Sequence, residues 1–502
     1  MVKYITERPM LLSGILCTII AFFGYNYMPI VLALVILLCV IIGLMLIYNG
    51  KTAVVFALLL VTLMASRTVY TYWRIEDFRK YIGNTYSLKC VVCEVKANNV
   101  FFNKLVVEVS EAKEIPKGTK IEVITSPFKP RLGQCIRANA KFTEIKEKNI
   151  KRMYSKEIYL TAKLSNMVFE NDEDFVLSGV GKLRKYIQKT LFRNLNYQKA
   201  ATLSALIYGD KTAFSDEFDY MVKRAGVSHI MVVSGMHLGI FVKSILSVAE
   251  WLGYNKYLKA LCMIASVFFL SFLCGFTASI LRAGITYILM AVSVVLNRKC
   301  DASNAIGAAL TFILIASPVA IFDIALQLSM LSTFGILVIS LPTMKYLTEK
   351  GFLKSKILKF LVSNTICTIS ATLLTLPVLI SCFGYISVIS LIPNLLIAPV
   401  IDWVLKLAFL MLVVNLFSPF LTALLFKGLD ILLGYINYII NFFGNIEWAI
   451  VELPNFFAFL SIILILLIFS VLIACKKYGY VVKLNEMKEK YIKEGGKKLK
   501  WQ

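Results

Sequence analysis

Histidine is almost absent from this chain, and its scarcity limits both metal binding and acid–base catalysis. The 502 residues include two histidines, His229 and His237, and both lie in the stretch Gly226–Gly239, GVSHIMVVSGMHLG. A zinc site needs three or four ligands, so these two would need carboxylates or cysteines beside them, and the sequence predicts no metal site and no cofactor. Ser234 lies three residues before His237, which suits a nucleophile and its base, but no carboxylate stands near them to orient the imidazole. Structural histidines at a helix break, a pore lining, an intramembrane hydrolase and a metal site remain as alternatives for this stretch.

Charged residues are also few, which excludes an ordinary soluble protein. They make up 17% of the chain, against 58% hydrophobic residues, and the mean hydropathy is +0.75. Soluble domains are about 45–50% apolar, and apolar runs long enough to span a bilayer recur throughout this sequence. The first apolar run, 10–25, is followed by no small-residue cleavage site, so it is not expected to be a cleaved signal peptide. The composition predicts a polytopic α-helical membrane protein.

The charges that are present are mostly positive, and they flank the apolar runs unevenly. The net charge is +24, and five lysines lie in the loop 344–359, whereas the loops 317–323, 382–387 and 441–455 contain no Lys or Arg. Because cytoplasmic loops carry the excess of Lys and Arg, both termini and the basic tail 476–502 are expected in the cytoplasm, where the tail would contact a motor protein or anionic lipids. About 12 spans are predicted: 10–25, 28–48, 52–70, 227–248, 258–274, 276–296, 304–321, 324–343, 357–381, 386–414, 418–440 and 456–474.

Residues 74–170 form a separate, strand-rich segment that this topology places outside the membrane. Hydrophobic and polar residues alternate in five runs, and Asn, Gly and Pro punctuate them. Five strands in so short a segment predict a small OB-like barrel. The segment contains 19 Lys and Arg against 11 Asp and Glu, which suits an anionic partner. The alternating runs are 86–96, 104–110, 119–124, 133–146 and 157–165.

Aromatic residues lie between the basic residues of this segment. Exposed aromatics on a basic barrel are typical of proteins that bind single-stranded nucleic acid. The alternative is that the aromatics are core residues and the lysines are solvated. The candidate DNA-binding residues are Phe101, Phe102, Lys129 and Arg131, and the other interleaved aromatics are Phe128, Tyr154 and Tyr159.

Three cysteines of the segment raise the question of a metal or a disulfide. Cys90 and Cys93 form a C-x-x-C pattern, but residues three apart on a strand face opposite sides, which argues against a zinc pair. If the segment lies outside the cell, Cys135 is a candidate for a disulfide with Cys90 or Cys93.

Residues 171–225 are expected to form amphipathic helices at the membrane interface, before a membrane domain over 226–475. Ser215 is placed as a helix N-cap, with acidic residues in the first turn and Lys223 and Arg224 in the last. Gly226 is expected to end this helix. The chain therefore divides into 1–73, 74–170, 171–225, 226–475 and 476–502.

Several polar residues lie inside predicted spans, where an ionisable group indicates function unless it serves as a polar contact between helices. Arg282 lies between apolar stretches, and Asp323 and Gln327 are four apart, so they share a helix face. Asp402 and Lys406 are also four apart and are expected to pair. Asn394 lies between Pro393 and Pro399, which are expected to break their span because each lacks a backbone donor.

The stretch ALIYGDKTAFSDEFDYMVKRAGVSHIMVVSGMHLGIF, residues 205–241, closely resembles the signature of the ComEC competence proteins. SILRAG at 279–284, ASPVAIFDIALQLSMLSTFGI at 316–336 and LPVLISCFGYISVISLIPNLLIAPVI at 376–401 resemble further blocks of that family, in the same order. The resemblance implies a channel that carries one DNA strand into the bacterial cytoplasm, with an exterior OB-like domain that handles DNA. The motif residues carried over are Gly209, Asp210, His229, Ser234, Gly235, His237, Arg282, Ala283, Asp323, Gln327, Ser329, Pro393 and Asn394; of these, Arg282, His237 and the helix break at 393–399 are expected to face the DNA path.

One feature of the family is missing from the sequence. Many members end in a metallo-β-lactamase-like domain with a His-x-His-x-Asp-His cluster, whereas no histidine follows His237 here. The chain is therefore expected not to be an enzyme, and the other DNA strand would be degraded by a separate nuclease. A DNA receptor and a cytoplasmic motor are further expected partners. The alternative function is a small-solute secondary transporter, because broken helices with polar midplane residues suit one, although the sequence shows no internal repeat.

Overall fold

The computed structural model of the chain describes residues 8–27, 52–98, 102–128, 130–352, 355–454, 456–465 and 467. It comprises two compact units. The first contains Met1–Met330 and Ser387–Ala449, and the second contains Leu331–Ile386 and Ile450–Gln502. Phe101, Lys129, the predicted span 28–48 and the basic tail 476–502 lie outside the described residues.

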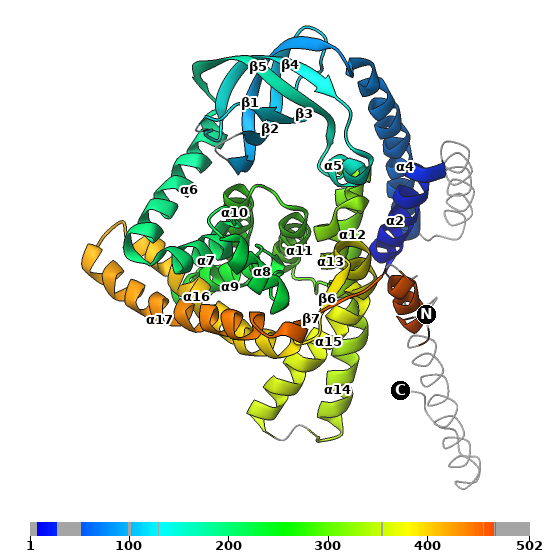
Figure 1. Cartoon of the computed structure of the whole chain (residues 1–502). Coiled ribbons are helices and arrows are strands. Elements are labelled where there is room, and N and C mark those ends of the chain that lie inside the picture. The colour runs from blue at the N-terminus through cyan, green and yellow to red at the C-terminus, as the bar shows by residue number, and fades with distance from the viewer. Residues whose placement is uncertain are drawn as a thin grey trace, which may run out of the picture. The chain divides into compact units, whose positions relative to one another are not determined.

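A closed barrel of five strands forms the strand-rich part of the first unit (Figure 1). The strands follow the order β1-β2-β3-β5-β4 around the barrel, and β3 and β5 run parallel while the other neighbours are antiparallel. All five strands predicted from the alternating pattern are present. Their bounds are β1 Thr85–Asn98, β2 Asn103–Ala112, β3 Lys120–Thr125, β4 Gln134–Thr143 and β5 Ile158–Glu173.

Alternate residues of each strand fill the barrel core, and several of the predicted surface aromatics belong to that core. Tyr159 is 7% exposed and stacks on Phe78 with ring centroids 5.4 Å apart. Tyr154 and Phe128 are partly buried against the same core. The core interpretation is therefore right for these three aromatics. The sequence left this open because alternation reveals the two faces of a strand but does not tell which one is buried.

The cysteines of the barrel remain thiols. Cys90 is fully buried in the core and Cys93 is partly buried, both as free thiols, so neither predicted disulfide with Cys135 is formed. In the ladder between β1 and β4, Cys135 pairs with Val91, while Cys90 pairs with Ile136. Adjacent positions on a strand point to opposite faces, so the Cys135 side chain is directed away from that of Cys90. Burial raises the pKa of both the Cys90 and the Cys93 thiol to about 12.

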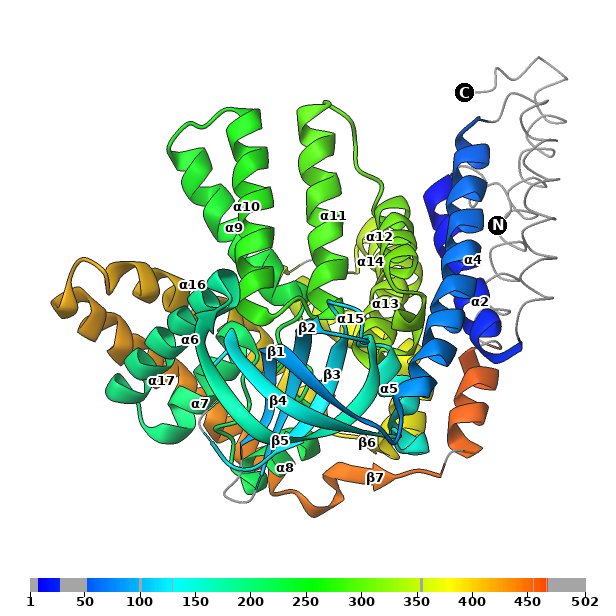
Figure 2. The same ribbon diagram turned by 90° about the horizontal axis from the view of Figure 1, so that it is seen from above.

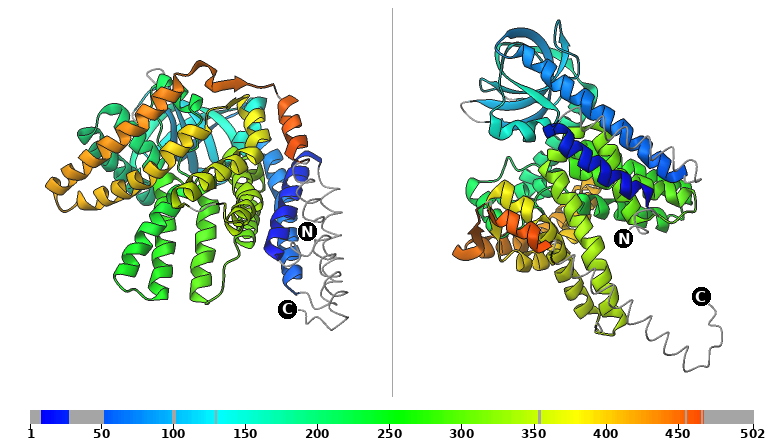
Figure 3. Two further views of the ribbon diagram at one scale, coloured as in Figure 1. Left: turned by 90° about the horizontal axis from the view of Figure 1, so that it is seen from below. Right: turned by 90° about the vertical axis from the view of Figure 1, so that its right-hand side faces the viewer.

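The N-terminal helices α2 (Pro9–Tyr27) and α4 (Thr52–Phe78) pack side by side and against α12 (Ala302–Ala316), as the right-hand view of Figure 3 shows for the first two. Small residues let the backbones approach: a Cβ built on Gly14 would lie 2.8 Å from the carbonyl oxygen of Gly307. Ser13 and Thr311 exchange a buried hydrogen bond of 2.9 Å across this contact. Such small-residue contacts with interhelical hydrogen bonds hold helices together where the hydrophobic effect does not.

Three helices lead from the barrel to the histidine stretch: α6 (Phe175–Asn194), α7 (Tyr197–Tyr208) and α8 (Asp216–Arg224). The predicted signals of α8 are confirmed, since the Ser215 hydroxyl accepts a hydrogen bond of 3.1 Å from the Phe218 amide, and Gly226 adopts a φ of +71°. In α6 most basic residues are exposed, but Nε of Arg184 donates to the Leu273 carbonyl at 2.7 Å, at the end of α10.

The remaining helices of the first unit are α9 (Gly235–Trp251), α10 (Lys256–Cys274), α11 (Ala278–Val295), α12, α16 (Leu391–Val414) and α17 (Pro419–Gly444). The helices α9, α10 and α11 lie next to one another (Figure 2). The short helix Pro318–Phe322 and the first part of α13 (Ile324–Gly335) also belong to this unit. The remaining short elements are Arg79–Tyr81, Glu147–Asn149, α5 (Ile150–Tyr154) and Glu447–Ala449.

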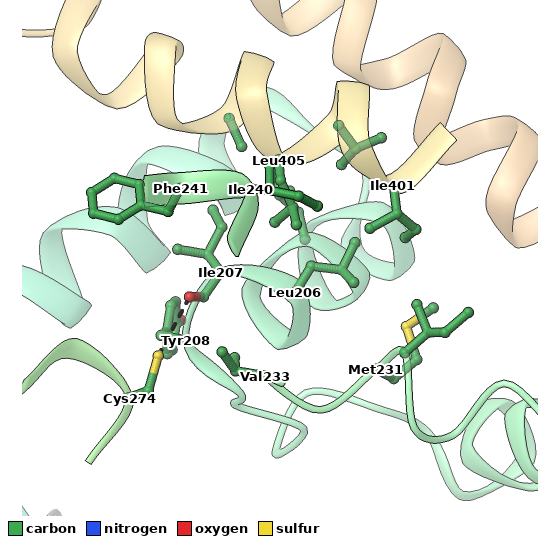
Figure 4. Close-up of a cluster of buried hydrophobic side chains, with 14 of the residues drawn as sticks. Leu206, Ile207, Tyr208, Met231, Val233, Ile240, Phe241, Cys274, Ile401 and Leu405 are labelled. Atoms are coloured by element: carbon green, nitrogen blue, oxygen red, sulfur yellow. Dashed lines mark hydrogen bonds between the residues drawn. The ribbon is translucent and has the colours of Figure 1, made fainter. Parts of the chain in front are cut away.

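A common hydrophobic core holds α7, α9, α10, α11, α16 and α17 together. Figure 4 shows its centre, where Leu206 and Ile207 of α7 lie near Ile401 and Leu405 of α16. The same view contains the thiol of Cys274, which donates to the Ile207 carbonyl at 3.7 Å.

In the second unit, α13 continues through a π-helix (Ile336–Ser340) into α14 (Leu341–Glu349), and α15 (Lys356–Phe383) returns along it. Pro342 is the second residue after the π-helix. Because proline lacks an N–H and its ring crowds the preceding turn, it accounts for the wider turn at this point. The strands β6 (Tyr385–Ser387) and β7 (Ile450–Glu452) form a small two-stranded sheet.

Six helices within the described residues are long and apolar enough to cross a membrane, so the protein is a helical membrane protein, although the predicted number of about 12 spans is not confirmed. The predicted span 227–248 begins as a helix only at Gly235, because Gly226 and Ser234 hold the preceding residues outside the helix. The predicted break at Pro393–Pro399 is wrong, since both prolines lie in the continuous helix α16. Pro393 is in its first turn, where a missing N–H costs no helical hydrogen bond. The six helices are α10, α11, α13 continued to Glu349, α15, α16 and α17, and shorter apolar helices cover Ser13–Phe22, Ala302–Ala316 and Phe456–Ile465.

Candidate functional site

The candidate site begins where the extended stretch before α9 becomes helical. The Nδ1 atom of His237 accepts a hydrogen bond of 3.3 Å from the Ser234 backbone N–H and lies 3.0 Å from the Ser234 hydroxyl. His237 therefore satisfies a backbone donor at the start of the helix, as the glutamate of a capping box does. The preceding His229 is exposed, whereas His237 is 1% exposed.

The second nitrogen of His237 decides what chemistry the Ser234–His237 pair can perform. Because Nδ1 accepts from the backbone N–H, the proton of the neutral ring is on Nε2. Among the described residues, Nε2 is buried without a hydrogen-bond partner. No carboxylate orients the ring as a nucleophile–base pair requires, so this geometry favours the structural role of His237 over the hydrolase alternative. Within the described part of the chain, no cluster of three or more His, Cys, Asp or Glu residues is arranged to hold a metal ion.

The two glycines of α9 let α11 approach closely. A Cβ built on Gly235 would lie 2.9 Å from Nη2 of Arg282 and 3.1 Å from Cβ of Ala283. On the next turn, a Cβ built on Gly239 would lie 2.7 Å from the hydroxyl of Tyr287. The atoms within 3.0 Å are the far ends of the Arg282 and Tyr287 side chains, so a larger residue at 235 or 239 would first displace that guanidinium or that hydroxyl.

Arg282 is the positive charge of this site. Its side chain is half-buried, and its Nε donates to the hydroxyl of Ser329 on α13 at 2.7 Å. Ser279, one turn earlier on α11, contacts the same hydroxyl at 3.3 Å. Among the described residues no carboxylate forms an ion pair with Arg282. A half-buried guanidinium without an acidic partner attracts anions, and its planar donor fork matches both carboxylate and phosphate groups.

Asp323 and Gln327 support this charge indirectly. Asp323 caps α13, because its Oδ1 accepts from the Leu326 amide at 3.0 Å. The Gln327 amide donates to the Ile321 carbonyl at 2.7 Å. Both side chains thus fix the corner from which α13 presents Ser329 to Arg282. For Gln327 this is a structural role, the polar contact that the sequence offered as the alternative to a function.

Residues of the stretches 205–241 and 376–401 form a corner at the end of α8. A Cβ on Gly226 would collide with Cβ of Ser390 and lie 2.8 Å from the hydroxyl of Ser387. The Ser387 hydroxyl also donates to the Arg224 carbonyl at 2.7 Å. The Arg224 guanidinium, in turn, donates to the Ile446 carbonyl beyond α17. The corner therefore joins the end of α8 to the start of α16 and the end of α17.

Gly209 and Asp210 shape the loop between α7 and α8. Gly209 ends α7 with a φ of +80°, a conformation that suits glycine. Asp210 accepts from the backbone and hydroxyl of Thr212 at 2.9 and 2.7 Å, which is the side-chain turn that aspartate favours. A Cβ on Gly209 would contact Val233 at 3.5 Å, so this loop lies against the histidine stretch.

Asn394 and Asp402 lie apart from these groups. Asn394 is 8% exposed in the first turn of α16, and its Oδ1 is buried without a partner. Asp402 accepts from Lys406 at 2.7 Å, as the spacing predicts, but both side chains are about two-fifths exposed, at 40% and 42%. The pair therefore lies on an accessible face of α16.

Of the candidate DNA-binding residues of the barrel, the structure describes two. Phe102 is 39% exposed, and Arg131 is exposed. Phe169 was not predicted; it is 46% exposed and packs against Phe128 with ring centroids 5.1 Å apart. Phe169 lies beyond the predicted alternating run 157–165, because β5 continues to Glu173, so alternation did not mark it.

Other residues of the site were also missed from the sequence. Tyr287 faces Gly239, and its position five residues after Arg282 gave no indication of this. Asn437 accepts a buried hydrogen bond of 2.9 Å from Thr202, and Asn441 follows it by one turn. Two asparagines four apart in an apolar helix share one face, and this spacing is the signal that could have revealed them.

Comparisons with known proteins place the chain in a family. Residues 206–478, which include the loop 209–215, α9, α11 and α16, match the family model described as competence protein. The chain is 24% identical over 266 residues to ComE operon protein 3 of Bacillus subtilis (strain 168), which covers 53% of this chain and 33% of that protein. The chain thus spans about one third of the length of this curated relative. No solved structure matches the chain. Because the family match covers more than half of the chain, this protein belongs to the competence protein family.

Proposed function

We propose that this protein is a channel that moves single-stranded DNA across the bacterial cytoplasmic membrane during DNA uptake and natural transformation. The observation that carries the proposal is Arg282, a half-buried cation that has no acidic partner among the described residues and lies beside the first turn of α9. An ionisable group inside a membrane domain marks a pathway for polar substrates. Family membership supports DNA as that substrate.

The sparse charge of the site suits the passage of a polyanion. A path lined with many fixed cations would hold a DNA strand by its phosphates, whereas weak binding at few sites lets it move on, as in ion channels. Ser329 bonds Nε of Arg282 and leaves the two terminal nitrogens of the guanidinium free of other hydrogen bonds within the described structure. These nitrogens are the donors with which Arg282 contacts passing phosphates. His229, exposed in the stretch before α9, lies on the same path.

The barrel is proposed as an extracytoplasmic OB-like domain that receives the DNA. Its closed order β1-β2-β3-β5-β4 supports the OB-like assignment, because that fold is a five-stranded barrel that binds oligonucleotides. Exposed Phe102 and Phe169, together with Arg131, supply rings and positive charge for a single strand. The uneven charge of the loops supports cytoplasmic termini and an exterior position for the barrel. A DNA receptor, a separate nuclease and a cytoplasmic motor are proposed as partners.

Uptake of labelled double-stranded DNA tests the proposal in cells that carry wild type, a deletion, Arg282→Gln or Asp402→Asn at matched membrane levels. The deletion is expected to lose cytoplasmic label because the channel is missing, and Arg282→Gln because it removes the positive charge of the site. Asp402→Asn, which removes a charge on the accessible face of α16, is expected to retain it. Normal uptake by the deletion strain, without a second copy of the gene, would refute the channel and favour the small-solute transporter.

A further inference from the structure

A separate cavity lies between α7, α8 and α17, outside the group around Arg282. Its volume is about 210 Å³, while a single water needs only about 10–15 Å³ on the same measure. The space is therefore large enough for a planar ring system. The residues that line it and bear on its chemistry are Tyr197, Gln198, Phe214, Glu217, Phe218 and Asn441.

Aromatic rings form one side of this cavity. Phe214 and Phe218 meet edge to face, with ring centroids 5.1 Å apart and an angle of 76° between their planes. Phe214 packs on the hydrophobic core, which fixes its position, while Tyr197 is 65% exposed at the mouth. Fixed rings beside an accessible one form a surface on which another flat ring stacks.

Polar groups line the remainder of the cavity. Asn441 lines the cavity, and its amide oxygen is buried without a hydrogen-bond partner among the described residues. The amide of Gln198 and the carboxylate of Glu217 add donors and acceptors. Amides and carboxylates are the side chains that pair with the edges of nucleobases, and aromatic rings are those that stack on their faces.

The cavity also lies next to the corner that precedes the histidine stretch. Its α8 residues Phe218 and Met221 belong to the helix that ends at Gly226, and Met221 packs against Gly444 at the end of α17. A strand that approaches the start of α9 along α8 would therefore pass this cavity before it reached His229. Phe218 and Met221 of α8 precede Gly226, and this position places the cavity before the histidine stretch on the proposed path.

We propose that this cavity binds one nucleobase of the incoming strand, with the base stacked on Phe214 and its edge hydrogen-bonded by Gln198 and Glu217. The proposal rests on the proposed function, because it assumes that a DNA strand passes this corner. The site holds an unpaired base as a checkpoint for single-stranded DNA, since a paired base does not enter a cavity of this size. Stacking tolerates every base, so the site admits any sequence.

Two measurements on the full-length protein in detergent test the proposal. In the first, a short oligothymidine that carries one 5-iododeoxyuridine is photo-cross-linked to wild type, and the cross-linked peptide is identified by mass spectrometry. We expect the cross-link on Tyr197, Phe214 or Phe218. In the second, the affinity for an oligothymidine is compared with that for an abasic strand of equal length. Phe214→Leu should lower the affinity for the oligothymidine about tenfold, because stacking is worth about 1–3 kcal/mol per base, and leave abasic binding unchanged.

A matched control and the DNA uptake assay separate the ways in which the proposal can fail. Tyr438→Leu removes a 65% exposed ring from α17 that does not line the cavity, and it should change neither affinity. Cross-links that avoid the cavity, or equal losses for the oligothymidine and the abasic strand in Phe214→Leu, would overturn the nucleobase site. The channel would survive that result if the deletion strain still lost DNA uptake. Normal uptake in the deletion strain would overturn the channel itself.

Discussion

Gly226 holds the corner between α8 and α16, and its replacement by alanine should destabilise the protein for two separable reasons. The first is the backbone, because a left-handed φ of +71° costs a residue with a Cβ about 1–2 kcal/mol. The second is steric, since the new Cβ would collide with Ser390 and crowd Ser387. Overpacking of this kind costs about 1–3 kcal/mol, so the two terms together amount to about 2–5 kcal/mol.

Gly253 provides the matched control for this prediction. It has a similar φ of +69°, but a Cβ built on it meets nothing within 4 Å. Gly253→Ala should therefore cost only the backbone term of about 1–2 kcal/mol. Thermal unfolding of the purified protein in detergent should show a larger fall in the midpoint for Gly226→Ala than for Gly253→Ala.

A second substitution isolates the steric term. The Ser390 side chain makes no capping hydrogen bond with α16, and glycine is a good N-cap residue. Ser390→Gly alone should therefore cost little stability. In the Gly226→Ala background it removes the colliding Cβ and should recover part of the lost stability, as a double-mutant cycle would show. Equal midpoints for Gly226→Ala and Gly253→Ala, or no recovery in the double variant, would refute the close packing of this corner.

Two further predictions concern the N-terminal helices and the barrel. Gly307→Ala should force α2 away from α12, because its Cβ would collide with the backbone of Met10 and Leu11. Thermal unfolding should show a loss of stability of about 1–3 kcal/mol. The control Gly428→Ala, whose Cβ would meet nothing within 4 Å, should be neutral or stabilising. In the barrel, burial opposes ionisation of Glu122, but hydrogen bonds from Lys104 and Lys96, at 2.8 and 2.5 Å, outweigh it and lower the pKa of this carboxyl. The two ion pairs therefore stabilise the barrel above the ordinary carboxyl pKa of 4.5, and this stability is lost as the pH falls through the lowered pKa. Loss of barrel stability exposes buried Cys90, so its reaction with a disulfide reagent active in acid should accelerate in wild type as the pH falls through the pKa of Glu122. The Glu122→Gln variant should react fast already at pH 7. A wild-type rate that does not change with pH would contradict this.

The sequence predicted those features that depend on neighbouring residues. Alternation located the five barrel strands, and Ser215 with Gly226 bounded α8, because strand faces and helix caps are local. The stretch 227–234 looked like part of a span since Ile230–Val233 is apolar, but the helix begins only at Gly235, after the N-cap Ser234.

Features that depend on contacts between distant residues were not readable from the sequence. Gly226 meets Ser387, and Phe214 lines a cavity with Asn441, although more than 150 residues separate each pair. The motif around Arg282 was identified from its resemblance to a family, yet the partner hydroxyl of Ser329 and the neighbouring Tyr287 required the packed helices. The predicted disulfide of Cys135 with Cys90 failed because register, which sets the face of each cysteine, is a property of the assembled barrel.

The central claim, that a DNA strand passes the start of α9, is tested most directly by cross-linking during uptake. A photo-reactive amino acid at position 229 would replace an exposed histidine of the stretch, and the same residue at position 403 would replace Trp403, which is 63% exposed beside Asp402. In cells that take up labelled DNA normally, we predict cross-links to single-stranded DNA from position 229 and none from position 403. Uptake at the normal rate with no cross-link from position 229, or with equal yields from both positions, would contradict the proposed path.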